Sequence, residues 1–116
     1  MKFILLNILF LSIVYADTFE NVQLLDFESK RDLTKYMKSI GKDLGVKCSH
    51  CHNMDDKAAD TPEKDTAREM IKLTRYLNDL LNTQFVDTTT SHKTYVTCWT
   101  CHFGTLDPVA KRPVEE

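Results

Sequence analysis

Cys48-Ser49-His50-Cys51-His52 is a Cys-x-x-Cys-His motif, and the same pattern recurs at Cys98-Trp99-Thr100-Cys101-His102. The two motifs contain all four cysteines of the 116-residue chain and three of its four histidines. This motif is typical of covalent haem attachment, in which both sulfurs form thioethers with the vinyl groups and the histidine binds the iron. We therefore expect two haem c groups, attached at Cys48, Cys51, Cys98 and Cys101, with His52 and His102 as proximal iron ligands.

Two other uses of the four cysteines compete with haem attachment. Disulfides suit an exported chain, but they do not explain why a histidine directly follows each cysteine pair. A zinc module can form from two Cys-x-x-Cys turns, yet it leaves both histidines without a role. Haem uses every one of these residues and adds apolar surface that so short a chain otherwise lacks. The protein without haem is therefore expected to be largely unfolded.

The N-terminus has the layout of a secretory signal peptide. Met1-Lys2 precedes the apolar run 3–14, and Ala16 supplies a small residue at the cleavage point. The run is shorter than the ~20 residues that a membrane-spanning helix needs, which disfavours an uncleaved anchor. We expect cleavage after Ala16, a periplasmic location, and one dihaem cytochrome c domain over residues 17–116.

The composition is that of a single globular domain. Hydrophobic residues make up 42% and charged residues 28% of the chain, which argues against disorder and fibrous repeats. The formal net charge is −2, and acidic and basic residues are interspersed along the sequence. These features predict no nucleic-acid binding, and the rest of the chain has no second run that could insert stably into a membrane. A monomer is expected.

Two amphipathic helices are predicted, and each carries a methionine. The first covers residues 26–44 and stops at Gly45; the second starts at the Asp60-Thr61-Pro62-Glu63 capping sequence and runs to about Leu81. Their apolar stripes comprise Leu33, Met37, Ile40 and Leu44 in the first helix, and Ala67, Met70, Ile71, Thr74, Leu77 and Leu81 in the second. Arg68, Lys72, Arg75 and Asp79 are expected to point away from the second stripe. Methionine on such a stripe usually packs in a core, so spacing alone leaves packing and iron ligation both open.

Three other side chains, those of Met54, His50 and His92, are of a type that can bind haem iron. Met54 follows His52 too closely to reach the opposite face of the same ring. His50 and His92 could each give a bis-histidine iron of lower potential, although exposed histidines in loops are more common. The polar stretch 82–97 is expected to be a loop that ends in a short extended piece at residues 95–97.

The chain resembles the cytochrome c subunit of bacterial photosynthetic reaction centres over about residues 33–108. The resemblance rests on matching segments in the same order: Tyr36–Gly41, Leu44–Asn53, Ala67–Ile71, Leu77-Asn78 and Val96–His102. It implies a mainly α, small multihaem-cytochrome fold, with helices packed on covalently attached haems and little or no sheet. That subunit carries four haems in two similar pairs, so this chain resembles one pair. In the family, a methionine on the helix before each motif is the usual distal ligand, which implies Met37 for the first haem and Met70 for the second.

Two departures from the family pattern bear on partners. Phe103 stands where many members have arginine after the second motif, and the chain has no lipid-anchoring cysteine at the expected cleavage point. Docking to a reaction centre is therefore not implied. We expect an electron-transfer protein rather than an enzyme, with soluble or membrane-bound redox proteins as partners and relatively high potentials from methionine ligation. The alternative, a dihaem peroxidase-like enzyme, would need an open coordination position.

Overall fold

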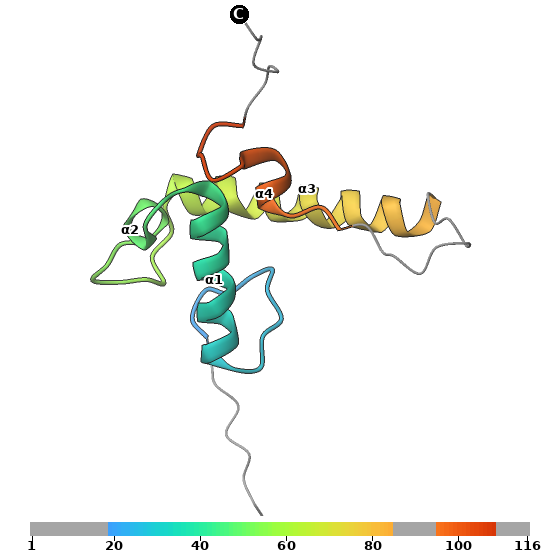
Figure 1. Cartoon of the computed structure of the whole chain (residues 1–116). Coiled ribbons are helices and arrows are strands. Elements are labelled where there is room, and N and C mark those ends of the chain that lie inside the picture. Colours follow the sequence, from blue (N-terminus) through green and yellow to red (C-terminus); the bar gives the residue numbers. More distant parts are fainter. Residues whose placement is uncertain (1–18, 85–94, 109–116) are drawn as a thin grey trace, which may run out of the picture.

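The computed structural model describes residues 19–84 and 95–108. Within them the chain forms four helices, α1 (Lys30–Leu44), α2 (Cys48–Cys51), α3 (Pro62–Gln84) and α4 (Cys98–His102), and no strand (Figure 1). The expected mainly α fold is therefore confirmed for this part of the chain. In these residues no helix is long and apolar enough to cross a membrane. The signal peptide expected at residues 1–16, and His92, lie outside the described residues.

Helix α1 begins at Lys30, so the expected start at Asp26 was wrong. Ser29 has extended backbone dihedrals, φ −125° and ψ 142°, and its hydroxyl accepts the Asp32 amide at 3.1 Å. A serine in this conformation caps a helix and ends the extended segment before it. At the other end the prediction was right, because Gly45 adopts the left-handed conformation, with φ 65°.

Helix α3 starts at the predicted place and runs slightly further than expected, to Gln84. The Thr61 hydroxyl accepts the Lys64 amide at 3.2 Å, and Pro62 occupies the first helical position, where its missing N–H costs nothing. Glu63 and Asp65 lie in the first turn, where carboxylates interact favourably with the helix dipole.

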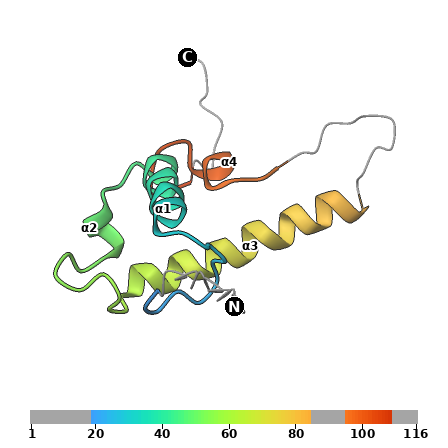
Figure 2. The same cartoon turned by 90° about the horizontal axis from the view of Figure 1, so that it is seen from below.

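The two long helices, α1 and α3, cross each other. Figures 1 and 2 show α1 running across α3, with α4 beside the C-terminal end of α1 and α2 beside the start of α3. The same pairs, α1 with α4 and α2 with α3, are in contact, and α1 also contacts α2. Each Cys-x-x-Cys-His helix therefore packs against the long helix that precedes the other motif.

The described residues contain very little core of their own. Ile71 is their only buried hydrophobic side chain, at 9% exposure. Large hydrophobic residues that are more than two-fifths exposed are Met54, Met70, Leu73, Tyr76, Tyr95, Trp99, Phe103 and Leu106. Burial of apolar surface is the main driving force of folding, and a chain of this size has little to spare. This distribution fits helices that pack on a large apolar group.

Candidate haem sites

The two motifs form matching helical turns. Residues three apart in a helix lie on the same side, so each turn presents its two sulfurs together. All four cysteines are free thiols. In each turn one thiol is exposed, Cys48 or Cys101, and the other is half-buried. Burial, with smaller contributions from Glu63 and Cys48, raises the pKa of Cys51; burial, and then the Asp43 carboxylate, raises that of Cys98.

The histidine that ends each motif is oriented in the same way. The Nδ1 atom of His52 lies 3.1 Å from the Lys57 carbonyl oxygen, and that of His102 lies 3.1 Å from the Thr105 carbonyl oxygen. A carbonyl oxygen can only accept, so in each bond Nδ1 carries the proton and Nε2 keeps its lone pair. Metal-ligating histidines commonly have such a carbonyl partner, which fixes the ring and its tautomer. Both rings are thus prepared for iron at Nε2.

The first motif is held by the N-terminal end of α3. The Thr61 hydroxyl, besides capping α3, donates to the Cys51 carbonyl at 2.8 Å. The Lys64 ammonium donates to three successive carbonyls, those of residues 57, 58 and 59, at 3.1, 3.2 and 2.7 Å. The first of these carbonyls also accepts from His52. Lys64 therefore positions the loop that orients the predicted proximal histidine.

The second motif is held by the C-terminal half of α3. The Asn78 side chain donates to the Val96 carbonyl at 2.8 Å and accepts the Val96 amide at 2.6 Å. This pair of bonds fixes the segment just before α4, and the extended backbone of Thr97 leads from it into the motif. After the motif, Thr105 donates its amide and its hydroxyl to the His102 carbonyl at 2.9 and 2.7 Å.

The two sites meet at the end of α1. The Gly104 amide, two residues after His102, donates to the Asp43 carbonyl at 2.9 Å. A Cβ atom at Gly45 would overlap the Gly104 carbonyl, so glycine is required there by space as well as by φ. Phe103 also has a positive φ, 51°, which turns the chain toward this contact. The backbone that leaves the second motif thus lies against the turn that enters the first.

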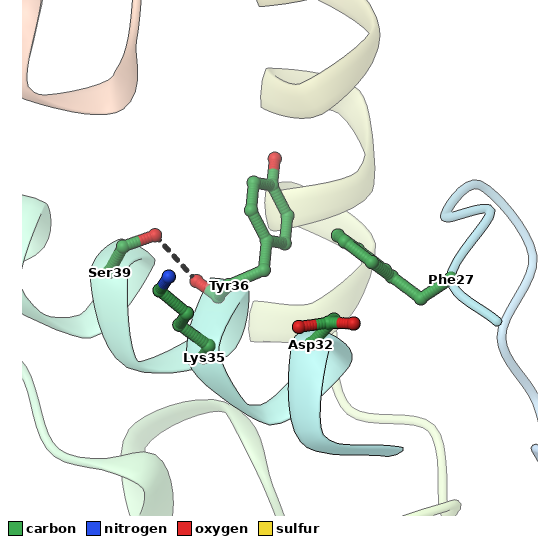
Figure 3. A pocket seen from close by; sticks show the side chains of 5 residues that line it. All are labelled: Phe27, Asp32, Lys35, Tyr36 and Ser39. Atoms are coloured by element: carbon green, nitrogen blue, oxygen red, sulfur yellow. Dashed lines mark hydrogen bonds between the residues drawn. The ribbon is translucent and has the colours of Figure 1, made fainter. Parts of the chain in front are cut away.

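Tyr36 lies on α1 between the N-terminal segment and the two motifs. Its ring contacts Phe27 with centroids 5.3 Å apart, in a groove also lined by Asp32, Lys35 and Ser39 (Figure 3). Burial raises the pKa of Tyr36, with smaller effects from Cys98, Arg75 and Asp43. The phenol therefore lies close enough to α3 and α4 to sense their charges.

The predicted distal ligands lie on the two long helices. Met37 is half-buried on α1, and Met70 is 42% exposed on α3. Met54 is 54% exposed in the loop after the first motif, and His50 is exposed on α2. Arg68, expected to point away from the apolar stripe of α3, has a side chain that is 16% exposed and pairs with the exposed carboxylates of Asp60 at 2.8 Å and Asp65 at 2.6 Å.

A four-cysteine zinc site does not fit this arrangement. Over residues 19–84 and 95–108, which include every cysteine, no three Cys, His, Asp or Glu side chains lie close enough to share a metal ion. A tetrahedral zinc site would require the four sulfurs to converge. Two separate attachment turns, each with a prepared histidine, instead fit two haems.

The family model of the photosynthetic reaction centre cytochrome c subunit matches residues 13–112. The chain belongs to this family. It is also similar to cytochrome c-554 of Chloroflexus aurantiacus, with 37% identity over 84 residues, which are 71% of this chain. The matched region spans only 20% of the length of that relative. No solved structure gives a significant match. Membership of a cytochrome c family implies covalently bound haem.

Sequence reasoning missed the residues that hold the two motifs in place. Asn78 and Lys64 bond to backbone groups, and no motif marks such partners in a sequence. One signal was present: Asn78 directly follows Leu77 of the apolar stripe, and an amide beside a buried stripe needs a hydrogen-bond partner.

Proposed function

We propose that this chain is an exported electron-transfer protein that carries two covalently attached haems, one on each motif. The observation that carries the proposal is the matching geometry of His52 and His102, each with Nδ1 bonded to a carbonyl and Nε2 free. When bound, haem iron supplies one-electron chemistry between the ferrous and ferric states. The chain's part is to attach the two groups, to orient their proximal ligands and to hold them close together.

Met37 and Met70 are the proposed distal ligands. Each lies on the long helix that precedes a motif, in the order that family resemblance implies, and each is at least partly accessible. Methionine opposite histidine raises the potential of a haem and closes its iron to substrates. This ligand set supports electron transfer over peroxidase chemistry. The proposed partners are soluble or membrane-bound redox proteins in the periplasm, to which the signal-like N-terminus would direct the chain.

A haem count tests the cofactor proposal. Purified protein should carry two haems per chain by mass spectrometry and alkaline pyridine spectra, and a reductive titration followed by absorbance should resolve two one-electron steps. Replacing Cys98 and Cys101 together by Ala should leave one haem. A single haem in the unmodified protein, or turnover of hydrogen peroxide at enzymatic rates, would contradict the proposal.

Single substitutions test the distal ligands. Met37→Leu and Met70→Leu should each remove about half of the weak red absorption band that reports iron–sulfur ligation in the oxidised state. Met54→Leu is the matched control and should keep the whole band, because Met54 lies in the exposed loop after the first motif. Retention of the full band in either of the first two variants excludes that methionine as a ligand.

A further inference from the structure

Four cations form one stripe along α1. Arg31, Lys35, Lys38 and Lys42 follow one another at spacings of four, three and four residues, which places them on the same side of a helix. All four are exposed, and together with Thr34 and Ser39 they line an open groove that contains no carboxylate. The ion pairs found in the described residues involve Arg68 and Lys72 of α3, and none involves this stripe. The cationic stripe has no acidic partner within the described fold.

The stripe concentrates positive charge on one side of α1. The interspersed acidic and basic residues of the sequence did not predict this concentration. Helix α1 carries five cations and two carboxylates, whereas α3 carries four of each and the whole chain has a net charge of −2. Like charges three or four residues apart destabilise a helix, and Arg31 in the first turn also opposes the helix dipole. Lys42 in the last turn interacts favourably with the dipole and balances Arg31, so the like-charge spacing is the remaining cost of this arrangement.

The stripe faces away from the apolar side of α1. At about 100° per residue, its four cations lie between about 100° and 160° round the helix axis from Met37. Leu33, Ile40 and Leu44 lie on the Met37 side, which is half-buried. The four cations thus remain available to an external partner, on the side of α1 away from Met37, the proposed distal ligand of the first haem.

We propose that the cationic stripe of α1 is the docking surface for an acidic redox protein, a partner for the electron transfer proposed above. Charge complementarity selects this partner: a rigid row of about 16 Å, at 1.5 Å per residue, matches a carboxylate-rich patch on another protein. A membrane surface fits less well. Helices that lie on membranes insert an apolar face beside their cations, whereas the apolar side of α1 is half-buried within the described fold.

Electron transfer from an acidic donor tests this surface. Reduced plant-type ferredoxin, used as the probe, gives up one electron and the haem iron of the intact holoprotein accepts it; stopped-flow absorbance follows the rate. If net charge governed the encounter, two acidic proteins would repel and the rate would rise with ionic strength. We expect the opposite, a fall of about tenfold or more between low and physiological salt.

Matched charge reversals locate the effect. Lys38→Glu should lower the second-order rate at low salt by about 3- to 10-fold, whereas Lys72→Glu, with the same change in net charge on α3, should lower it by less than half as much. Lys38→Arg should keep the original rate. Excess dithionite, which needs no docking surface, should reduce the haem of all variants to the same final extent.

The outcomes separate this proposal from the function that it rests on. Protein that dithionite cannot reduce would refute electron transfer itself. Normal dithionite reduction, with a ferredoxin rate that rises with salt or with equal effects of Lys38→Glu and Lys72→Glu, would overturn the docking surface alone. Binding of phosphatidylglycerol vesicles that depends on Lys38, without a ferredoxin effect, would assign the stripe to a membrane surface and overturn the protein partner.

Discussion

Replacing Asn78 should loosen the second site more than any other single amide change in α3. Asn78→Ala removes two hydrogen bonds, of 2.8 and 2.6 Å, and leaves the half-buried Val96 amide and carbonyl without their partner. Each bond contributes about 0.5–1.5 kcal/mol, so the free energy of unfolding should fall by about 1–3 kcal/mol. For a domain of this size the melting temperature should drop by about 4–8 °C per kcal/mol. Denaturation of the holoprotein, followed by far-ultraviolet circular dichroism, measures both.

Two further variants sharpen the test of Asn78. Asn82→Ala is the matched control, because within the part of the chain that the structure describes the Asn82 side chain bonds only inside α3, to the Asn78 carbonyl. Asn78→Asp keeps the acceptor for the Val96 amide but places a second oxygen against the Val96 carbonyl. Only its protonated form can donate there, so the folded state should raise the pKa of the new carboxyl. Its loss of stability should therefore be small below about pH 4 and should grow as the pH rises. If Asn78→Ala costs no more than Asn82→Ala, the paired bonds do not hold the second motif.

Three other changes probe the first site and the junction. Lys64→Met removes the donor to three loop carbonyls, so limited proteolysis should cut the loop after the first motif about tenfold faster. This factor is equivalent to ~1.4 kcal/mol of local stability. An unchanged cleavage rate would mean that the hydrogen bonds of Lys64 do not hold the loop. The hydrogen bond from Arg68 lowers the pKa of Asp60, so the stability that Asp60 adds is complete above about pH 4 and is lost as the pH falls through its folded-state value. Denaturant titrations at several pH values should therefore show a shallower loss of stability in acid for Asp60→Asn than for the unmodified protein. Gly45→Ala should lower the free energy of unfolding by at least ~2 kcal/mol, from the left-handed φ and the overlap with a backbone carbonyl. Gly41→Ala should lower it by less, because its backbone is helical and its Cβ would lie 3.0 Å from the Val46 carbonyl oxygen, a tight contact without overlap. Equal urea midpoints for the two alanine variants would argue against a tight junction.

Local signals in the sequence predicted the elements well and their contacts poorly. Gly45, Thr61 and Pro62 mark the ends of the long helices because capping depends on the residues at the boundary itself. The early start expected for α1 came from extending the polar and apolar pattern through residues 26–29, where the hydroxyl of Ser29 instead ends the extended segment. The motifs were found because their spacing is fixed by the chemistry of attachment. The bonds of Lys64 and Asn78 to distant carbonyls could not be predicted, since they depend on how α3 lies against the two motifs.

The same long-range bonds explain why the two motifs form one structural unit. Helix α3 follows the first motif and precedes the second, and it is tied to both, through Thr61 to Cys51 and through Asn78 to Val96. Helix α1 precedes the first motif, and its end is tied to Gly104 after the second. With Ile71 as the only buried hydrophobic side chain among the described residues, these bonds alone cannot supply the stability of a folded domain. Groups bound at the motifs would cover the exposed helix faces, so binding at either motif would stabilise helices that the other motif also needs. Attachment of the two proposed haems and folding of the chain should accordingly be coupled, because any group that binds only the folded state shifts the folding equilibrium toward it.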